Sequence, residues 1–277
     1  MVAKKQDHGV VLITGASSGI GRELALAFAD RAATLVLVAR RVERLETLQA
    51  EVLARHPSVK VVVLAADLAD EQDIERLLGR VAEQAGPVDV LVNNAGLGDN
   101  VLFDRCDWTR TRRLLQTNVI AVTRLTAALL PGMVARGRGG VLNIGSGAGH
   151  TVLPSAAAYS GSKHFVAGFT EGLRADVAGT GVTVTQVCPG PVDSEFDQVA
   201  GSVGGMPGAP PEFIRIGARQ CAVEAVAGFE RGDAVVFPGW AYRTLIRMLP
   251  LAPRGLLRRQ AAGVAAKLRA SAGKVKN

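Results

Sequence analysis

Short apolar runs alternate with longer amphipathic segments along most of this 277-residue chain. The runs have the length of buried strands, and the segments between them are long enough for helices. Strands are predicted at Val10–Thr14, Thr34–Ala39, Val59–Ala65, Val88–Val92, Val141–Ile144, Val182–Val187 and Val235–Phe237. Strands that alternate with helices indicate right-handed βαβ units, and therefore a parallel sheet. We expect an α/β fold with a doubly wound, Rossmann-like parallel sheet in three α/β/α layers.

Helices are predicted between these strands, where apolar residues recur at helical spacing. They are expected at about Arg22–Arg31, Asp70–Gln84, Trp108–Arg136, Tyr159–Ala178 and Ala218–Glu230. Pro131 falls inside the third pattern, and we expect it to break that helix because proline lacks an amide hydrogen.

A loop rich in glycine and proline precedes the helix at Ala218. Seven of the eleven residues from Gly201 to Pro211 are Gly or Pro. A loop of this length is typical of a lid, which we place at about 195–216. Its apolar residues favour an apolar substrate, although the same residues could simply pack the loop against the body.

Composition places the chain among compact α/β proteins, with 48% hydrophobic residues and 32 glycines. The three cysteines lie far apart in the sequence, which argues against a disulfide scaffold or a zinc site. No apolar run has the pattern of a signal peptide or the length of a transmembrane helix. We therefore expect a cytoplasmic protein without a metal.

Positive charge is concentrated at the C-terminus. The formal net charge is +7, but nine Lys or Arg and no acid follow Ala234, which leaves −2 for the residues before it. Because the main body is close to neutral, we expect no nucleic-acid partner. Binding of nucleic acid by the tail alone would fall steeply with salt.

Residues 239–277 are predicted to form a basic helical extension of a catalytic domain at residues 1–238. Two apolar stripes recur there at helical spacing: Tyr242, Leu245, Ile246 and Leu249, then Leu257, Ala261, Val264 and Leu268. Basic amphipathic helices suit peripheral contact with an anionic membrane, here its inner face. The alternative, which we prefer, is that the apolar faces pack on the body or on another subunit.

A glycine-rich loop, Gly15–Gly21, follows the first strand and precedes the first helix. Glycines let a backbone approach a pyrophosphate, and the amides at a helix start favour negative charge. The spacing G-x-x-x-G-x-G is neither the G-x-G-x-x-G form nor a P-loop, so the loop taken alone could be an ordinary tight turn.

Two arginines follow the second strand, at Arg40 and Arg41. Nucleotide sites of this kind place an acid there for the ribose 2′-hydroxyl of NAD, whereas arginine suits the 2′-phosphate of NADP. The pair could also begin an exposed helix, since charged residues continue after it. We prefer NADP, with NAD as the less favoured cofactor.

Ser146, Tyr159 and Lys163 have spacings that suit proton transfer to a carbonyl oxygen. Tyr159 and Lys163 lie one helical turn apart, so the cation can sit beside the phenol and lower its pKa. A tyrosine tuned in this way can give or take a proton near neutral pH. Ser146 follows a strand and could hydrogen-bond the same oxygen. A Tyr-x-x-x-Lys spacing also occurs by chance in many helices.

Taken in order from about Val10 to Ser194, and more weakly to Phe237, these residues resemble the short-chain dehydrogenase/reductase family. The matching motifs are TGxxxGIG at Thr14–Gly21, NNAG at Asn93–Gly96, a tetrad at Asn118, Ser146, Tyr159 and Lys163, and PG at Pro189–Gly190. The resemblance implies that Tyr159 is the general acid/base and that Ser146 holds the substrate carbonyl. It also implies that Lys163 binds the nicotinamide ribose and depresses the Tyr159 pKa. Asn118 would hold a water in the proton path.

The resemblance also implies contacts with the cofactor, including Asp67 and Leu68 at the adenine and the PG motif at the nicotinamide. The expected set is Gly15, Ser17, Ser18, Gly19, Ile20, Gly21, Arg40, Arg41, Asp67, Leu68, Asn94, Ala95, Gly96, Tyr159, Lys163, Pro189, Gly190, Val192 and Ser194. Two positions depart from the family. Ser194 replaces a common Thr, and Ser18 lacks the basic side chain of some NADP-preferring members, so Arg40 must supply most of that preference.

The sequence therefore predicts an NADPH-dependent oxidoreductase that interconverts a ketone or aldehyde and its alcohol on a hydrophobic substrate. A homodimer or homotetramer is expected from the resemblance. The alternative is a protein that binds NADPH without turnover, as a sensor or as a membrane-associated scaffold. The intact tetrad argues against that alternative.

Overall fold

The computed structural model describes residues 8–151, 153–193, 195–196, 212–249 and 253–273. Its centre is a parallel sheet of seven strands in the order β3-β2-β1-β4-β5-β6-β9. The strands are β1 Val10–Thr14, β2 Thr34–Ala39, β3 Lys60–Ala65, β4 Val90–Asn93, β5 Gly139–Ile144, β6 Val182–Val187 and β9 Val235–Val236. The strand order reverses beside β1, which confirms the predicted doubly wound, Rossmann-like α/β fold.

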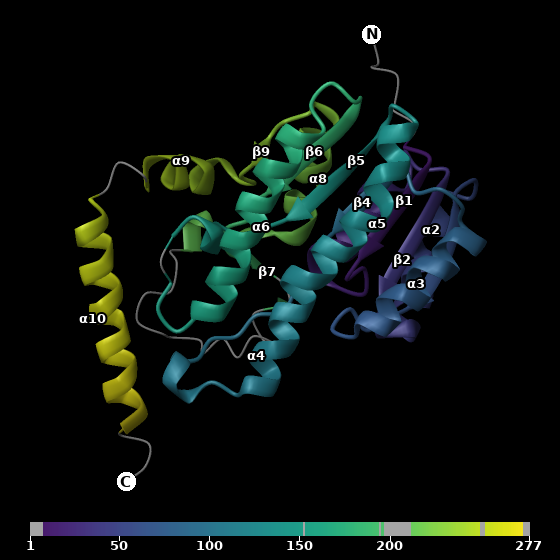
Figure 1. The fold of residues 1–277 in the computed structure, drawn as a ribbon. Coiled ribbons are helices and arrows are strands. Elements are labelled where there is room, and N and C mark those ends of the chain that lie inside the picture. The colour runs from purple at the N-terminus through teal and green to yellow at the C-terminus, as the bar shows by residue number, and fades with distance from the viewer. Residues whose placement is uncertain (1–7, 152, 194, 197–211, 250–252, 274–277) are drawn as a thin grey trace.

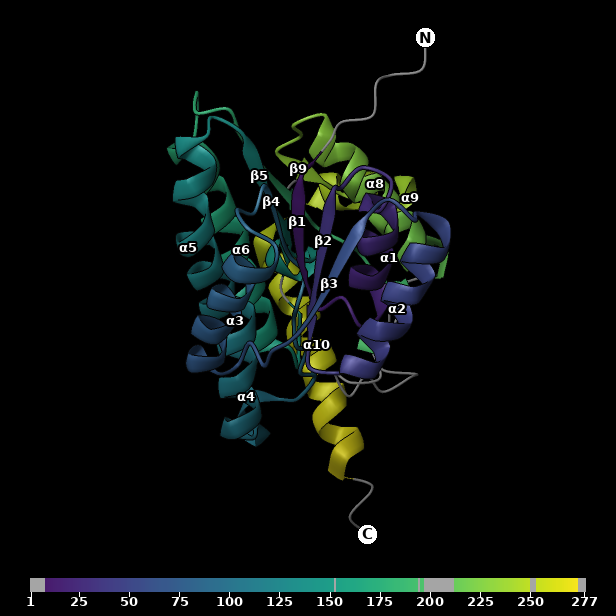
Figure 2. The same ribbon diagram turned by 90° about the vertical axis from the view of Figure 1, so that its right-hand side faces the viewer.

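Helices cover both faces of the sheet (Figures 1 and 2). One layer holds α1 Gly19–Phe28, α2 Val42–Arg55 and α8 Ala218–Glu230, and the other holds α3 Glu71–Gln84, α5 Ala121–Ala135 and α6 Ala157–Asp176. Strand residues alternate between the two hydrophobic cores: Val11 and Ile13 of β1 face the first layer, and Leu12 faces the second. Burial on both faces explains why β1 and β2 are almost continuously apolar.

Shorter elements complete the fold. They are η1 Phe103–Arg105, α4 Trp108–Leu115, the π-helical turn η2 Gln116–Ile120, η3 Gly147–Gly149, the pair β7 Val192–Asp193 and β8 Ile216–Gly217, η4 Glu212–Ile214, and the tail helices α9 Trp240–Met248 and α10 Arg254–Gly273. The tail helices lie on the side of the molecule away from α2 and α3 (Figure 1).

The expectation that Pro131 breaks its helix is wrong. α5 continues through Pro131 to Ala135. The missing amide leaves the carbonyl of Ala127 without its helical donor, but both residues are exposed and water can bond to that oxygen. The irregularity lies upstream instead, in the π-helical turn that contains Asn118.

The stretch Trp108–Ala135 is long and apolar enough to span a membrane by length and composition. In this fold it is a layer helix, since α5 packs on β4 and β5 and against α3. Packing on the body accounts for the buried third of this apolar window.

Candidate active site

Tyr159 and Lys163 project from one side of α6 towards the end of β5. The Lys163 Nζ lies 5.9 Å from the centre of the Tyr159 ring. The same ammonium donates a hydrogen bond of 2.8 Å to the carbonyl of Ile144, the last residue of β5. Because Ser146 follows Ile144 by two residues, the fold brings the end of β5, the amine and the phenol into one region.

Lys163 is almost completely buried, with 5% of its surface exposed. Burial lowers the pKa of Lys163 from 10.5 to about 8 because the charged form loses hydration. The neighbouring Cys188 does not offset this effect at neutral pH, because burial raises the pKa of that thiol to about 12 and it stays uncharged. An amine that titrates near 8 can exchange a proton close to physiological pH.

Asn118 is held by a π-helical turn and is 1% exposed. Its Oδ1 accepts from the Leu97 amide at 2.8 Å, and its Nδ2 donates to the Leu97 carbonyl at 2.9 Å and to Ser162 Oγ at 3.0 Å. π-Helical turns of this kind occur frequently at functional sites. Through these bonds the side chain holds the segment that follows β4 at Leu97.

Gly96 lies between Asn118 and Lys163. A Cβ at Gly96 would lie 3.5 Å from Asn118 Oδ1 and 3.6 Å from Lys163 Nζ. The NNAG turn, the π-helical turn and α6 therefore converge at one point beside the sheet.

Ser146 caps the short helix η3, where its Oγ accepts from the Ala148 amide at 3.1 Å. This bond uses one lone pair of the hydroxyl and leaves its O–H free to rotate and donate. Tyr159 is half-buried, and its ring packs 5.6 Å from that of Phe196, at a tilt of 48°. The segment after β7 thus contributes an apolar wall beside the phenol.

The glycine loop is shaped by close contact with the NNAG turn. Gly15 has a φ of +68°, and a Cβ there would lie 2.8 Å from the Cα of Ala95. Asn94 Nδ2 donates to the Thr14 carbonyl at 2.8 Å, which ties the ends of β1 and β4 together. Glycine is required here both for its φ and for the close approach.

The start of α1 suits an anionic group. The helix begins at Gly19, and the preceding Ser18 makes no side-chain capping bond. The first amides of α1 therefore keep their donors for another partner. Together with the crowded glycines, this arrangement fits the pyrophosphate of a dinucleotide.

Arg41 and Arg40 lie in different surroundings. Arg41 donates to Ser17 Oγ at 3.0 Å and Ser18 Oγ at 2.9 Å, and it pairs with Glu195 at 3.1 Å. Hydrogen bonds from Arg44, and then from Arg41, hold the pKa of Glu195 below its usual value. Arg41 therefore links the glycine loop to the segment after β7, a contact that the sequence does not reveal.

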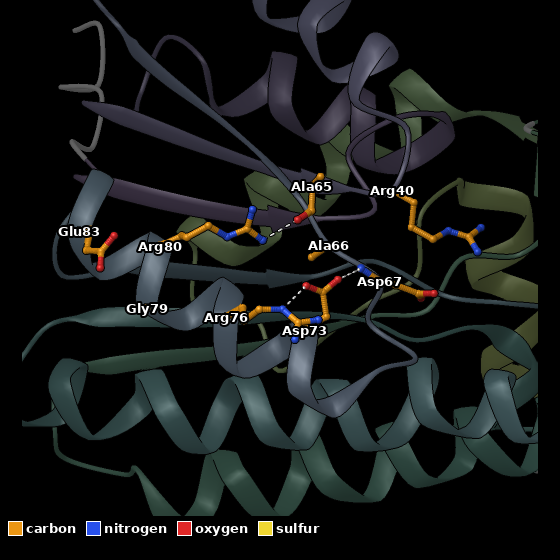
Figure 3. A pocket seen from close by; sticks show the side chains of 9 residues that line it. All are labelled: Arg40, Ala65, Ala66, Asp67, Asp73, Arg76, Gly79, Arg80 and Glu83. Atoms are coloured by element: carbon orange, nitrogen blue, oxygen red, sulfur yellow. Dashed lines mark hydrogen bonds and ion pairs between the residues drawn. The ribbon is translucent and has the colours of Figure 1, made fainter.

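Arg40 lines an open hollow of about 790 Å³ beside the edge strand β3 (Figure 3). Within the hollow Arg80 donates to the Ala65 carbonyl, and Asp73 accepts from the Asp67 amide. Burial raises the pKa of Asp67, but a 2.7 Å hydrogen bond from Arg113, the Ala69 amide and the charges of Arg113 and Arg40 outweigh it, so the net shift is downward.

The remaining predicted cofactor residues differ in their burial and in their neighbours. Leu68 is 7% exposed and belongs to the core on the α3 side, so a contact with adenine would fall to its backbone. Pro189 and Gly190 follow β6, and the Pro189 carbonyl accepts from the Gly147 amide at 2.9 Å. Val192 pairs with Ile216 in the small sheet. Ser194 and residues 197–211 of the expected lid lie outside the described residues.

The first tail helix adds a residue that the sequence did not assign to the site. Tyr242 is 6% exposed and packs with Ile214 and Ile246, with its ring against Gly190. Its Oη is buried and has no hydrogen-bond partner among the residues that the structure describes. Burial raises the pKa of Tyr242 well above 10, so the phenol is neutral.

The first of the two predicted apolar stripes of the tail therefore packs on the body, as one of the two interpretations predicted. Tyr242 and Ile246 are buried and Leu249 packs beside them, but Leu245 is 49% exposed and does not belong to the buried face. α10 is less enclosed; its Arg269 pairs with Asp104 of η1 at 2.8 Å.

Within the described part of the chain, no group of three or more His, Cys, Asp or Glu side chains could hold a metal ion. His150 Nε2 lies 3.3 Å from Cys188 Sγ beside η3, and this pair stands apart from any third ligand among those residues.

Comparisons with known proteins agree with this architecture. A model of the short chain dehydrogenases matches residues 9–202. An uncharacterized oxidoreductase of Myxococcus xanthus is 38% identical over 253 residues, covering 91% of this chain and 96% of the relative. Sulfoacetaldehyde reductase 2 of Chromohalobacter salexigens is 40% identical over 69% of this chain and 75% of its own.

Two solved structures are similar over nearly the whole fold. A short-chain dehydrogenase from Sphingobium yanoikuyae in complex with NADPH has a TM-score of 0.78 and 33% identity, covering 90% of this chain and 95% of that one. A bulky-bulky ketone specific alcohol dehydrogenase from Comamonas testosteroni has a TM-score of 0.74 and 30% identity, covering 90% and 93%.

The fold and the grouped motifs thus define a dinucleotide-binding α/β oxidoreductase. The chain belongs to the short-chain dehydrogenase family, whose members act on alcohol and carbonyl groups.

Proposed function

We propose that this enzyme uses NADPH to reduce a ketone or aldehyde on a hydrophobic substrate, or oxidises the corresponding alcohol. The observation that carries the proposal is the group formed by Tyr159, Lys163 and the end of β5. Lys163 Nζ lies 5.9 Å from the Tyr159 ring and is bonded at 2.8 Å to the Ile144 carbonyl. A cation in that place favours the charged form of a phenol.

The bound nicotinamide would supply the hydride that forms the new C–H bond at the carbonyl carbon. Tyr159 donates its phenolic proton to the carbonyl oxygen, and Ser146 holds that oxygen through its hydroxyl. Lys163 stabilises the resulting phenolate until a proton from solvent restores it. In the oxidation direction Tyr159 accepts the proton instead.

The preference for NADPH rests on the arginines after β2. Arg40 lines the hollow beside Asp67, and Arg41 reaches the serine hydroxyls of the glycine loop. Either guanidinium can meet a 2′-phosphate, which an NAD ribose lacks. The NADPH complex of the Sphingobium yanoikuyae relative agrees with this assignment.

A hydrophobic substrate is favoured by Phe196, whose ring packs against Tyr159. The names of the relatives indicate two different kinds of substrate, bulky ketones for one and sulfoacetaldehyde for another. A substrate panel must therefore include bulky aryl ketones, long-chain aldehydes and sulfoacetaldehyde.

We also propose a homodimer or homotetramer. The exposed side of the α4–α6 layer carries apolar side chains, among them Ile120 at 40% and Phe165 at 41% exposure. Burial of such residues between subunits favours association. Light scattering on the purified protein measures the mass directly, and a monomer at micromolar concentration would contradict this part of the proposal.

The function is tested by following NADPH oxidation across that panel, with NADH in parallel. Tyr159→Phe should lose a factor of about 10² to 10⁴ in kcat while it still binds NADPH in calorimetry. Tyr242→Phe is the matched control, because it removes the other phenolic hydroxyl of the chain, which has no partner among the described residues. Tight NADPH binding without turnover of any substrate would support the sensor or scaffold alternative.

A further inference from the structure

α9 has a second apolar face that does not pack on the body. Trp240, Leu245 and Met248 are 79%, 49% and 59% exposed. Trp240 and Met248 lie two turns apart on the same side of the helix, opposite the buried Tyr242 and Ile246. We call Trp240, Leu245 and Met248 the outer face of α9.

Phe213 is a further exposed aromatic side chain, in an element that contacts α9. It belongs to η4, which packs under α9 through Ile214, and it is 73% exposed. A folded surface rarely exposes several large apolar side chains on one short helix unless they have a partner.

The charges of the tail divide into two groups. Arg243 and Arg269 face the body and are matched by the body's acids, Glu224 at 2.7 Å and Asp104 at 2.8 Å. Arg247, Arg258 and Arg259 are exposed and form no ion pair with any residue that the structure describes. No acid follows Ala234 in the sequence. Negative charge on a binding partner would therefore neutralise these exposed arginines.

We propose that the outer face of α9 and these arginines form a docking surface for an anionic phospholipid bilayer. Tryptophan prefers the interface between headgroups and acyl chains, and leucine and methionine gain from burial below it. Arginine meets the lipid phosphates, and each basic residue near such a surface strengthens binding by roughly fivefold.

Two other occupants fit less well. A second copy related by a two-fold axis would bring the same arginines together without an acid from either tail. Nucleic acid would satisfy the arginines but would leave Leu245 and Met248 in water. Figure 1 shows α9 and α10 together on one side of the molecule.

Docking in this way places the bilayer near the active site. The buried face of the same helix carries Tyr242, which packs against Gly147 and Gly190. A hydrophobic substrate could then reach the site from the membrane. This last step rests on the proposed reductase function, whereas the docking itself does not.

The test uses the full-length protein and sedimentation with vesicles of phosphatidylcholine, alone or mixed with phosphatidylglycerol. We expect binding to the anionic vesicles, little binding to the neutral ones, and weakening as salt increases. Trp240→Ser with Met248→Ser should reduce binding at least tenfold, as should reversal of Arg247, Arg258 and Arg259 to Glu. Leu53→Ser, at an exposed leucine of α2 on the opposite side of the molecule, is the control.

Fluorescence gives an independent readout because the chain has two tryptophans, Trp108 and Trp240. In a Trp108→Phe background, Trp240 emission should shift to the blue on anionic vesicles. The proposal is overturned by an absent shift, by binding that the outer-face variants leave unchanged, by a change of oligomeric mass in those variants, or by competition from duplex DNA. None of these outcomes depends on turnover, so failure of the docking proposal and failure of the reductase proposal are distinguishable.

Discussion

The phenol of Tyr242 lies directly on Gly147, the residue after Ser146. A Cβ at Gly147 would overlap the Tyr242 Oη, and a Cβ at Gly190 would lie 2.6 Å from its ring. Gly147 and Gly190 belong to the loops after β5 and β6, which are joined by the bond from the Gly147 amide to the Pro189 carbonyl. The first tail helix therefore fixes the loops that carry Ser146 and the PG motif.

Gly147→Ala should lower the free energy of unfolding by about 1–3 kcal/mol, because the added methyl overpacks a closed contact. It should also reduce kcat, since Ser146 is displaced with the loop. Tyr242→Phe in the same chain removes the overlapping oxygen and should restore part of both losses. Chemical denaturation and NADPH turnover check the pair.

Gly161→Ala is the matched control for that experiment. Gly161 lies in α6, and a Cβ there would meet no atom within 4 Å. Alanine is the better helix former, so this variant should be as stable as the parent or slightly more stable. A Gly147→Ala protein that matches Gly161→Ala in stability would contradict the packing that we describe.

The protein should become more stable as the pH rises, because the buried charge of Lys163 is then lost. Burial lowers its folded pKa to about 8 from 10.5, so between these values the unfolded chain binds more protons than the folded one. The cost of the buried charge is fully present below pH 8 and disappears as the pH rises to about 10.5. At neutral pH it is on the order of 3 kcal/mol.

Lys163→Met removes that buried charge but also the hydrogen bond to Ile144, which contributes about 1 kcal/mol. We expect the variant to be inactive and yet more stable than the parent at neutral pH by about 2 kcal/mol. The advantage should shrink towards pH 10. Urea denaturation across this range measures it, with Lys60→Met, at an exposed lysine on β3, as the control. An advantage that grows with pH would show that the sign is wrong.

Arg40 and Arg41 should both contribute to the choice of cofactor, but in different ways. Arg40→Ser removes a cation from the hollow beside Asp67 and should raise the KM for NADPH by about 10- to 100-fold, with little change for NADH. Arg41→Ser should also raise the KM for NADPH. In addition it removes one of the two arginines that bind Glu195 and leaves the pair with Arg44. Steady-state kinetics with both cofactors separates these effects. Equal losses with NADH and NADPH would rule out recognition of the 2′-phosphate.

The sequence allowed much of the fold to be predicted because its signals are local. β1, β2 and β6 have the predicted bounds: β1 and β2 are buried apolar runs, and β6 alternates valine with threonine before Pro189 and Gly190. The contacts of Glu195 with Arg41 and of Asp67 with Arg113 join residues far apart in the chain, and no spacing rule predicts such pairs. The outer face of α9 was missed for a related reason: periodicity identifies an apolar stripe but not which neighbours leave part of the helix exposed.

Asn118→Asp tests whether the π-helical turn tunes Lys163. The substitution keeps the shape of the side chain but removes the donor to Leu97 and Ser162 and adds a negative charge. Asn118 Oδ1 and Lys163 Nζ both lie within 3.6 Å of the same point at Gly96, so the new charge should raise the pKa of Lys163 above about 8. The basic limb of the pH profile of kcat/KM for carbonyl reduction should then move to higher pH. Asn118→Ala, which adds no charge, should lose about 2–3 kcal/mol of stability through the same broken bonds without that displacement. Identical pH profiles for the two variants would mean that Asn118 acts on the fold of the turn and not on the titration of the lysine.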